Sequence, residues 1–312
     1  MLIFELAYAR NGADGTLREV MKEEAVAEAR PNVHRRRFGS ALRSLRIAAG
    51  LSMDEAAERL GLSGKPALSK IENGKQRVSG LGLTAFLQVY GVDAEGTVSK
   101  VKGMASLAAS GKRTNLLDEY KDAIRSQEFE EFLNLEGMAS KAESYLHVVP
   151  GLLQTEDYAT AIVDSSHKWP SKREIKQFVA LRMARQAALT RESPIEFWCI
   201  LDESALRRTA GGPEVMRGQL RKLLDVTEPG GNVAIQVLPF SAGAHAGIDG
   251  SFQLLHFHVG PPVAVVESMT TSLYLEEDRD IGRYEAALDF LRAQALDGQA
   301  SRRFIHDLIK DC

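Results

Sequence analysis

Four short helix patterns in close succession over residues 33–93 constrain the fold of this chain more than any other feature of its sequence. The apolar residues of the first pattern recur every three or four positions and end before a glycine: Phe38, Leu42, Leu45, Ala49 and then Gly50. This spacing puts apolar side chains on one face of a helix, and a glycine after the last of them is a common helix stop. The N-terminal part of the chain is therefore expected to form a small, purely helical domain.

The three patterns that follow have start and stop signals of their own. Residues 52–55 (S-M-D-E) form a capping box, which predicts a helix over 53–60. A third helix is predicted from Pro66 to the Asn-Gly pair at 73–74, because proline is tolerated at the first helical position. The fourth helix is predicted over 81–90. A glycine follows each predicted helix, so the connecting turns are expected to be short.

The charge of the chain is unevenly distributed. Residues 33–93 contain ten lysine and arginine side chains against five acidic ones, whereas the whole chain has a net charge of −3. Residues 1–32 and 94–312 are both acidic overall. A compact basic block ahead of a larger acidic body indicates that an anion such as DNA meets only the N-terminal part.

Small and apolar residues in the basic block explain how its helices can present a surface to DNA. The alanine pair at 56–57 and the turn at Gly61 allow a tight helix crossing. Leu68 and Ile71 hold the back of the third helix on the core, so its N-terminal half can face a DNA major groove. The turn at Gly74 is expected to leave backbone amides that can meet a phosphate.

Over residues 42–74 the segment resembles the helix-turn-helix of the phage-repressor class, the xenobiotic-response-element (XRE) type. The recognition helix of that class commonly ends in I-E-N-G, as residues 71–74 do here. The resemblance implies sequence-specific binding to double-stranded DNA, and a homodimer, because repressor-class modules read two half-sites. A protein-binding module with the same four-helix fold is the alternative.

Matched position by position, the resemblance implies that the third helix reads DNA through Lys65, Pro66, Ser69 and Lys70. The two lysines can pair with guanine acceptors or with phosphate, and the sequence does not choose between them. This chain departs from the family pattern in two ways. The turn at 62–65 looks one residue longer than usual, and Pro66 cannot donate a hydrogen bond where the family often has a donor.

Further DNA contacts are expected around the third helix. Met53 occupies a place where the family approaches the DNA backbone, and Ser63 either caps the third helix or contacts a phosphate. The other candidates are basic residues of the same block: Arg43, Lys75 and Arg77. The three arginines at 35–37 form either a phosphate-contacting arm or a solvated helix start. Glu72 is expected to pair, buried, with an arginine of the first helix or with Arg77 rather than to contact a cytosine.

The rest of the chain predicts a larger mixed α/β body, so the whole chain is α+β: a helix-turn-helix domain at 33–93 and a body at 116–312. In the body, strand-like segments separated by Gly and Pro turns lie between helical segments, which favours a mostly antiparallel or mixed sheet. Residues 94–115 are small and polar and are expected to form a linker with some helix. Residues 1–32 are weakly patterned and are expected to form a flexible extension, in which Met21 is an alternative start.

The body contains a second recognisable run, V-P-G-L-L-Q-T-E-D-Y-A at residues 149–159. This run resembles the C-terminal domain, of uncharacterised function, that follows such a helix-turn-helix in many actinobacterial regulators. The resemblance implies an antitoxin-type regulator, often encoded beside a small partner protein. Together the two resemblances cover about residues 33–310.

From its residues alone, the same run predicts a strand, a turn and a helix capped by Thr155, with Tyr158 facing the core. The alternative is a ligand or partner pocket lined by Gln154 and Tyr158. His245 lies in a glycine-rich loop at 243–250 that is flexible enough to fold over a ligand, although a single loop histidine is more often solvated.

Catalytic and metal-binding functions have little support in the sequence. It contains no phosphate-binding loop, dinucleotide-binding fingerprint or nucleophile elbow, so no enzyme activity and no cofactor are expected. The adjacent acids at 202–203 fit a capped helix start better than an acid–base pair. His256 and His258 share one face of a predicted strand without a third ligand, so no metal site is expected.

The sequence also predicts where the protein acts. No apolar run approaches the ~18 residues of a transmembrane helix, and the first ten residues are a poor signal peptide. The two cysteines form no disulfide framework. A reduced cytoplasm is therefore the expected location, and no membrane contact is expected.

Taken together, the patterns predict a DNA-binding transcriptional regulator with a C-terminal sensor or partner-binding domain. The alternative is an antitoxin-like interaction subunit whose main ligand is its small partner protein. The body is expected to dimerise, and one of its last helices carries an apolar stripe: Ile281, Tyr284, Leu288, Leu291 and Ala295. Either this stripe is buried on the domain's own sheet, or part of it, or the helix at 304–309 behind it, meets its twin across a two-fold axis.

Overall fold

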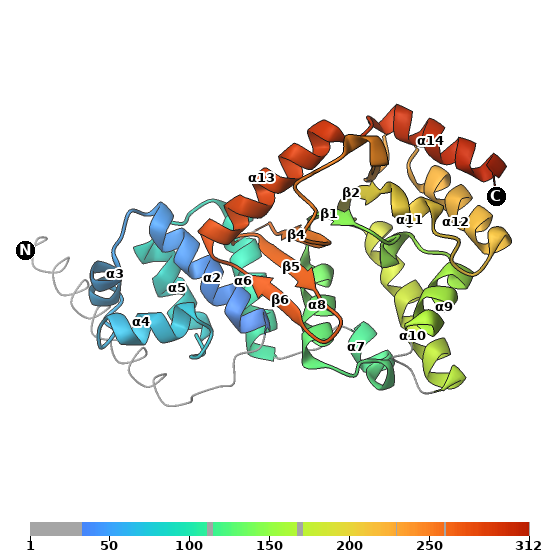
Figure 1. Ribbon diagram of the computed structural model, residues 1–312. Helices are drawn as coiled ribbons and strands as arrows, with labels where there is room; N and C mark the ends of the chain where they lie inside the picture. Colours follow the sequence, from blue (N-terminus) through green and yellow to red (C-terminus); the bar gives the residue numbers. More distant parts are fainter. Residues whose placement is uncertain (1–32, 111–114, 167–170, 229, 259, 312) are drawn as a thin grey trace, which may run out of the picture. The chain divides into compact units, whose positions relative to one another are not determined.

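The computed structural model (Figure 1) describes residues 33–110, 115–166, 171–228, 230–258 and 260–311. The predicted extension at 1–32, with its alternative start Met21, lies outside the described residues. The chain divides into an N-terminal unit, residues 1–112 together with the short segment 258–261, and a C-terminal unit, residues 113–257 and 262–312. Within the described ranges, no helix combines the length and the apolar character that a membrane span requires.

Over residues 33–110 the N-terminal unit is helical, with α2 (Val33–Ala48), α3 (Met53–Arg59), α4 (Lys65–Glu72), α5 (Gly80–Val89) and α6 (Glu95–Ser110). The four helices expected over residues 33–93 are present, with ends within about one residue of those predicted. The predicted capping box is formed, because the Ser52 side chain accepts from the Glu55 amide while the Glu55 carboxylate accepts from the Ser52 amide. Apolar side chains of all five helices make one core.

Helix α6 corrects the predicted linker at 94–115. Val101 is fully buried and Ala108 is 6 % exposed, and both belong to the apolar cluster that contains Leu42 of α2 and Phe86 of α5. The segment is rich in Gly, Ala and Ser, so its composition resembles a linker. Its few larger apolar residues nevertheless recur at helical spacing, and burying them against α2 and α5 outweighs the weak local preference.

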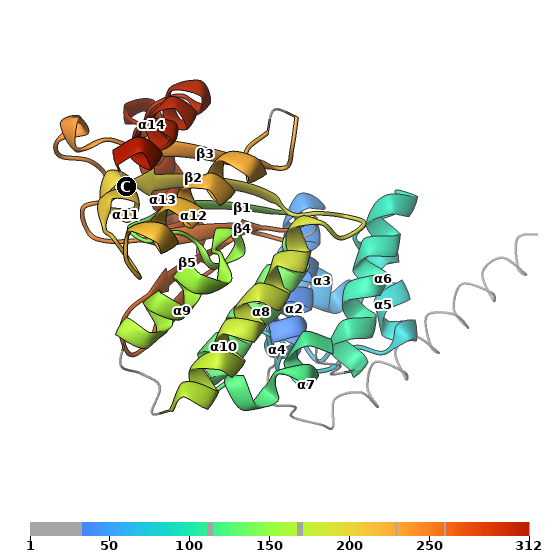
Figure 2. The same cartoon turned by 90° about the vertical axis from the view of Figure 1, so that its right-hand side faces the viewer.

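The C-terminal unit is built around a six-stranded sheet with the order β3-β2-β1-β4-β5-β6 (Figure 2). The strands are β1 (Lys141–Leu146), β2 (Glu196–Asp202), β3 (Val233–Leu238), β4 (Phe252–His256), β5 (Val263–Glu267) and β6 (Ser272–Leu275). The β1–β2 and β2–β3 pairs are parallel, and the β1–β4, β4–β5 and β5–β6 pairs are antiparallel. The predicted fold class, an all-α domain followed by a mixed α/β body, is confirmed.

Helices connect and cover these strands. The helices of the body are α7 (Asn115–Glu119), α8 (Gln127–Met138), α9 (Glu156–Ser165), α10 (Lys172–Ala184), α11 (Glu203–Arg207), α12 (Pro213–Val226), α13 (Asp278–Gln294) and α14 (Gly298–Asp311). The β1–β2 connection contains α9 and α10, and the β2–β3 connection contains α11 and α12. Parallel strands need such long crossovers, whereas the antiparallel strands β5 and β6 are joined by a short turn.

The apolar stripe of α13 packs on the sheet of its own domain. Ile281, Leu288 and Leu291 are 5 %, 3 % and 0 % exposed, in one cluster with Tyr145 of β1 and Leu254 of β4. The stripe is therefore core, and the interpretation that it meets its twin across a two-fold axis is corrected. Its 3-4-3-4 spacing fits either arrangement, and only the position of the sheet decides between them.

A charged cluster ties α13 to the sheet. Glu143 of β1 is buried and accepts from Arg292 of α13 at 2.8 Å, with His256 Nε2 of β4 and Lys141 Nζ at 2.8 and 2.9 Å. The Arg292 guanidinium also lies 3.6 Å from the centre of the Trp198 ring. The hydrogen bond from His256, opposed by burial and helped by Lys141, lowers the pKa of Glu143 to about 2.

We expect the Glu143 cluster to give the body an acid-sensitive contribution to stability. The folded-state pKa of about 2 lies below the ordinary 4.5, so ionised Glu143 stabilises the fold above pH 4.5. That contribution is lost as the pH falls from 4.5 towards 2. Glu143→Gln should therefore cost about 2 kcal/mol at pH 7 and progressively less below pH 4.5, measured by urea unfolding across pH. A deficit that is independent of pH would contradict this assignment.

Candidate nucleic-acid interface

Helix α4 is held against α2 by two close backbone approaches. A Cβ atom at Gly39 of α2 would lie 2.4 Å from the carbonyl oxygen of Glu72, so only glycine fits there. Gly74, just after α4, has φ of 69°, and its Cβ would lie 2.7 Å from the carbonyl carbon of Arg35. Sequence reasoning did not single out Gly39. A glycine in the middle of a helix pattern is the signal that could have found it, because it usually marks a close packing contact.

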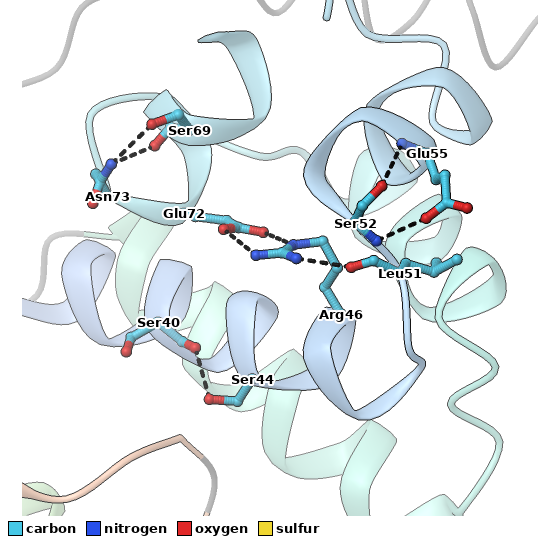
Figure 3. A network of polar contacts seen from close by, with 9 residues as sticks. All are labelled: Ser40, Ser44, Arg46, Leu51, Ser52, Glu55, Ser69, Glu72 and Asn73. Atoms are coloured by element: carbon cyan, nitrogen blue, oxygen red, sulfur yellow. Dashed lines mark hydrogen bonds and ion pairs between the residues drawn. The ribbon is translucent and has the colours of Figure 1, made fainter. Parts of the chain in front are cut away.

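A buried ion pair fixes the same two helices (Figure 3). The Arg46 Nε and Nη2 atoms of α2 donate to the Glu72 carboxylate of α4 at 2.7 and 3.1 Å, and Nη1 donates to the Leu51 carbonyl at 2.8 Å. Arg46 and Glu72 are 7 % and 6 % exposed. The hydrogen bond with Glu72 raises the pKa of Arg46 despite its burial. This confirms that Glu72 pairs with an arginine of the first helix rather than facing DNA.

The opposite face of α4 carries the predicted recognition residues. Lys65, Pro66 and Lys70 are exposed and Ser69 is half-buried, whereas Leu68 and Ile71 are buried in the core. A face of this kind, polar outward and apolar inward, is what a recognition helix needs in order to enter a groove while staying on its scaffold.

Asn73 belongs to the same polar face. Its Nδ2 atom donates to the Ser69 carbonyl oxygen at 2.8 Å and to Ser69 Oγ at 3.2 Å (Figure 3). Ser69 Oγ therefore accepts from Asn73, which orients the serine hydroxyl. Sequence reasoning treated Asn73 only as part of the helix stop, although its position four residues after Ser69 places both side chains on one helix face.

The remaining candidate DNA contacts surround α4 on other elements of the unit. Arg43, Ser63, Lys75 and Arg77 are exposed. Met53 is half-buried and packs partly against the core, so its side chain has a structural role. As a group, the arginines at 35–37 form neither a phosphate-contacting arm nor a solvated helix start, because Arg37 is only 1 % exposed. Burial, and then the charge of Arg77, lowers the pKa of Arg35.

Both turns that flank α4 differ from what the sequence suggested. Gly64, rather than Ser63, is the N-cap residue, and no side chain caps the helix. After the helix, the amide of Gly74 donates to the Ile71 carbonyl, and those of Lys75 and Gln76 donate to the Lys70 carbonyl. These amides are used inside the protein, because the last carbonyls of a helix need donors. The expectation that they meet a phosphate is therefore corrected.

The three residues singled out in the body do not form one site. Gln154 is buried after the P-G-L-L-Q-T turn and lines a cavity of the body. Tyr158 is 2 % exposed on α9 and does not line that cavity, and its amide donates to the capping Thr155 hydroxyl at 3.2 Å. His245 lies in its predicted loop with its ring against Tyr145, and it does not line the cavity either.

The acids at 202–203 and His256, which were weighed for catalysis or metal binding, have structural partners, whereas His258 lies beyond the end of β4. Asp202 caps α11, its Oδ1 atom accepting from the Ser204 amide at 2.9 Å, so the predicted capped helix start is confirmed. His256 lies beside Glu143, as described above. Among the residues that the structure describes, no group of three or more His, Cys, Asp and Glu side chains could hold a metal ion.

Comparisons with known proteins follow the same division of the chain. The family model described as a helix-turn-helix domain matches residues 37–97. The family model described as a domain of unknown function (DUF5753) matches residues 129–307, more than half of the chain. Neither a curated protein nor a solved structure matches the chain. The chain thus carries the helix-turn-helix domain of a DNA-binding transcriptional regulator, and it belongs to the family defined by the DUF5753 domain.

Proposed function

We propose that this protein is a sequence-specific transcriptional regulator of the XRE class that acts in the cytoplasm as a homodimer. Its body would serve as a sensor or partner-binding domain and carry out no catalytic step. The observation that carries the proposal is the two-faced character of α4. Its buried face is fixed by the Arg46–Glu72 ion pair, and its outer face carries Lys65, Ser69 and Lys70.

The chemistry of the outer face suits direct reading of bases. Lysine can donate to the O6 and N7 acceptors of guanine, and serine can donate a hydrogen bond to a base edge or accept one from it. Pro66 lies between these residues and offers only apolar contact, such as with a thymine methyl group. The basic residues around α4 would add phosphate contacts that set affinity and salt dependence.

Homodimerisation remains part of the proposal because repressor-class modules read two half-sites about one helical turn apart. The apolar stripe of α13 is buried in its own domain, so it does not supply the dimer contact. Phe290, on the same helix, is 66 % exposed and is a candidate for that contact.

Lys70→Ala tests the reading role of α4. If Lys70 reads a base, the variant should lose about 1–3 kcal/mol of affinity for the operator, selected beforehand with the full-length protein, and relax specificity at one position. If Lys70 contacts a phosphate, affinity should fall alike on all sequences and the salt slope should decrease by about one. Fluorescence anisotropy at several salt concentrations distinguishes these results.

Lys100→Ala is the matched control, because Lys100 is an exposed lysine on α6. It should leave affinity for the operator unchanged. Unchanged affinity of Lys70→Ala on both operator and random DNA would mean that α4 is not the reading element. Absence of salt-dependent DNA binding, together with co-purification of a small protein encoded nearby, would favour the antitoxin-like alternative instead.

A further inference from the structure

The body contains a cavity of about 560 Å³ beside the P-G-L-L-Q-T turn. Its walls come from α8, α10, the turn at 149–154 and the β5–β6 turn. The cavity is bordered by Glu267 and Met269, both exposed to solvent. A volume of several hundred cubic ångströms is typical of sites that take small organic ligands.

Side-chain hydrogen bonds hold the backbone of the turn that borders this cavity. Gln154 Nε2 donates to the Val149 carbonyl at 2.6 Å. The Gln154 carbonyl accepts from Gln186 Nε2 at 2.7 Å and from Lys222 Nζ at 2.9 Å. Gln219 Nε2 donates to the Leu153 carbonyl at 2.8 Å. A turn whose backbone carbonyls are satisfied by side chains from α12 and from the chain after α10 forms a preorganised wall.

Three arginines line the cavity, and their charges are compensated differently. Arg125 forms an ion pair with Glu174. Arg185 is 8 % exposed and forms a bidentate pair with Glu136, at 2.8 Å from Nε and 2.7 Å from Nη2. Arg182 donates from Nη1 to the neutral side-chain oxygen of Gln154 at 2.9 Å. Its buried Nε atom has no hydrogen-bond partner among the described residues. Among the described residues, Arg182 therefore brings one positive charge to the cavity without a direct ion pair to a carboxylate.

Burial, and then the nearby charge of Arg185, lowers the pKa of Arg182 to about 10. The guanidinium therefore remains protonated at neutral pH, but its charged form is destabilised where it stands. The negative charges of Glu267 and Glu136 oppose this shift only in part. An anion placed beside this buried guanidinium would stabilise its charged form.

The wall next to Arg182 is aromatic. Its guanidinium lies 5.1 Å from the centre of the Phe178 ring of α10. Phe129 of α8 contacts that ring at 5.4 Å between centroids. An apolar surface joined to one buried cation matches a ligand that has an apolar body and a single negative charge.

We propose that this cavity binds a small organic carboxylate, with the carboxylate on Arg182 and an aromatic or aliphatic body against Phe129 and Phe178. A monoanion fits better than a phosphate dianion, because Arg185 is already neutralised by Glu136 and the exposed carboxylates of Glu128 and Glu267 also line the cavity. This inference rests on the proposed sensor role of the body, for which it names the ligand class and the residues.

Binding of 4-phenylbutyrate to the full-length protein, measured by isothermal titration calorimetry, tests the inference. The uncharged 4-phenylbutyramide and inorganic phosphate are titrated in parallel. Phenylbutyrate should bind with a stoichiometry of one per chain, at least about tenfold more tightly than the amide, and phosphate should not compete. Equal binding of acid and amide, no binding of the acid, or competition by phosphate would overturn the proposal.

Arg182→Gln should weaken phenylbutyrate binding about tenfold or more, because it removes the charge, whereas Arg182→Lys should retain part of it. Arg283→Gln is the matched control, since Arg283 is an exposed arginine on α13 outside the cavity. Circular dichroism and operator affinity should be unchanged in all three variants without ligand. If the Arg182 variants bind DNA normally and bind phenylbutyrate as tightly as the wild type does, the ligand site alone is refuted. If the wild-type protein does not bind DNA, the proposed regulator function is refuted.

Discussion

Glu72→Ala is expected to lower the free energy of unfolding of the N-terminal unit by about 3–5 kcal/mol. The substitution leaves the buried Arg46 guanidinium without its carboxylate partner, and an uncompensated buried charge costs more than the ion pair itself contributes. Because small domains are stable by only about 5–15 kcal/mol, the variant should be largely unfolded under mild denaturing conditions. Operator binding should be lost with the fold, since Glu72 is the last residue of α4.

Chemical denaturation followed by circular dichroism measures this effect, with two comparison variants. Glu72→Gln keeps the shape of the side chain and one hydrogen-bond acceptor. Its free energy of unfolding should therefore lie between those of the wild type and Glu72→Ala. Glu55→Ala removes an exposed carboxylate that belongs only to the capping box of α3, so its loss should be much smaller. Similar losses for Glu72→Ala and Glu55→Ala would show that the ion pair does not hold the two helices together.

Leu291→Asp is expected to unfold the C-terminal unit, with a loss of more than about 4 kcal/mol. Leu291 is fully buried under the sheet in the cluster that contains Tyr145 and Leu254, so aspartate would place an unpaired charge in the core. Phe290→Asp changes the preceding residue, which is 66 % exposed, and should leave the fold intact. Solubility and thermal unfolding of the two variants give a direct comparison.

The same pair of variants examines the proposed homodimer. A folded Phe290→Asp protein that sediments as a monomer and binds its operator more weakly would assign the dimer contact to the outer side of α13. A Phe290→Asp protein that is folded and dimeric would show that the outer side of α13 is not the dimer contact. A well-folded Leu291→Asp protein, in either oligomeric state, would contradict the burial of the stripe.

Local patterns in the sequence were sufficient to predict the helices of the DNA-binding unit. The capping box at Ser52 and the apolar spacing around Leu68 act over a few residues, and the structure contains both. Helix α6 was expected only as some helix within a linker, because its helical preference is weak and its stability comes from burying Val101 against distant helices. Gly39 was overlooked for a related reason: its role is to admit the α4 backbone, more than thirty residues later.

In the body too, prediction from local sequence patterns fails where the contacts join residues far apart in the chain. The order of the strands along the chain could be predicted, but their order in the sheet could not, because β1 pairs with strands on both sides from distant parts of the chain. The cavity depends on this arrangement. Gln154 was a candidate from its motif, whereas Arg182 lies 28 residues away and became part of the site only when α10 was placed beside the turn.

The central claim, that α4 reads DNA sequence, is tested most directly by mapping the genomic sites bound by the full-length protein and by its Lys65→Ala/Lys70→Ala variant. We predict that the wild type occupies a limited set of sites that share a two-fold symmetric motif, with half-sites about one helical turn apart. The double variant, folded and present at equal levels, should lose these sites or bind without preference. Equal occupancy of the same sites by both proteins, or no discrete sites for the wild type, would contradict the claim.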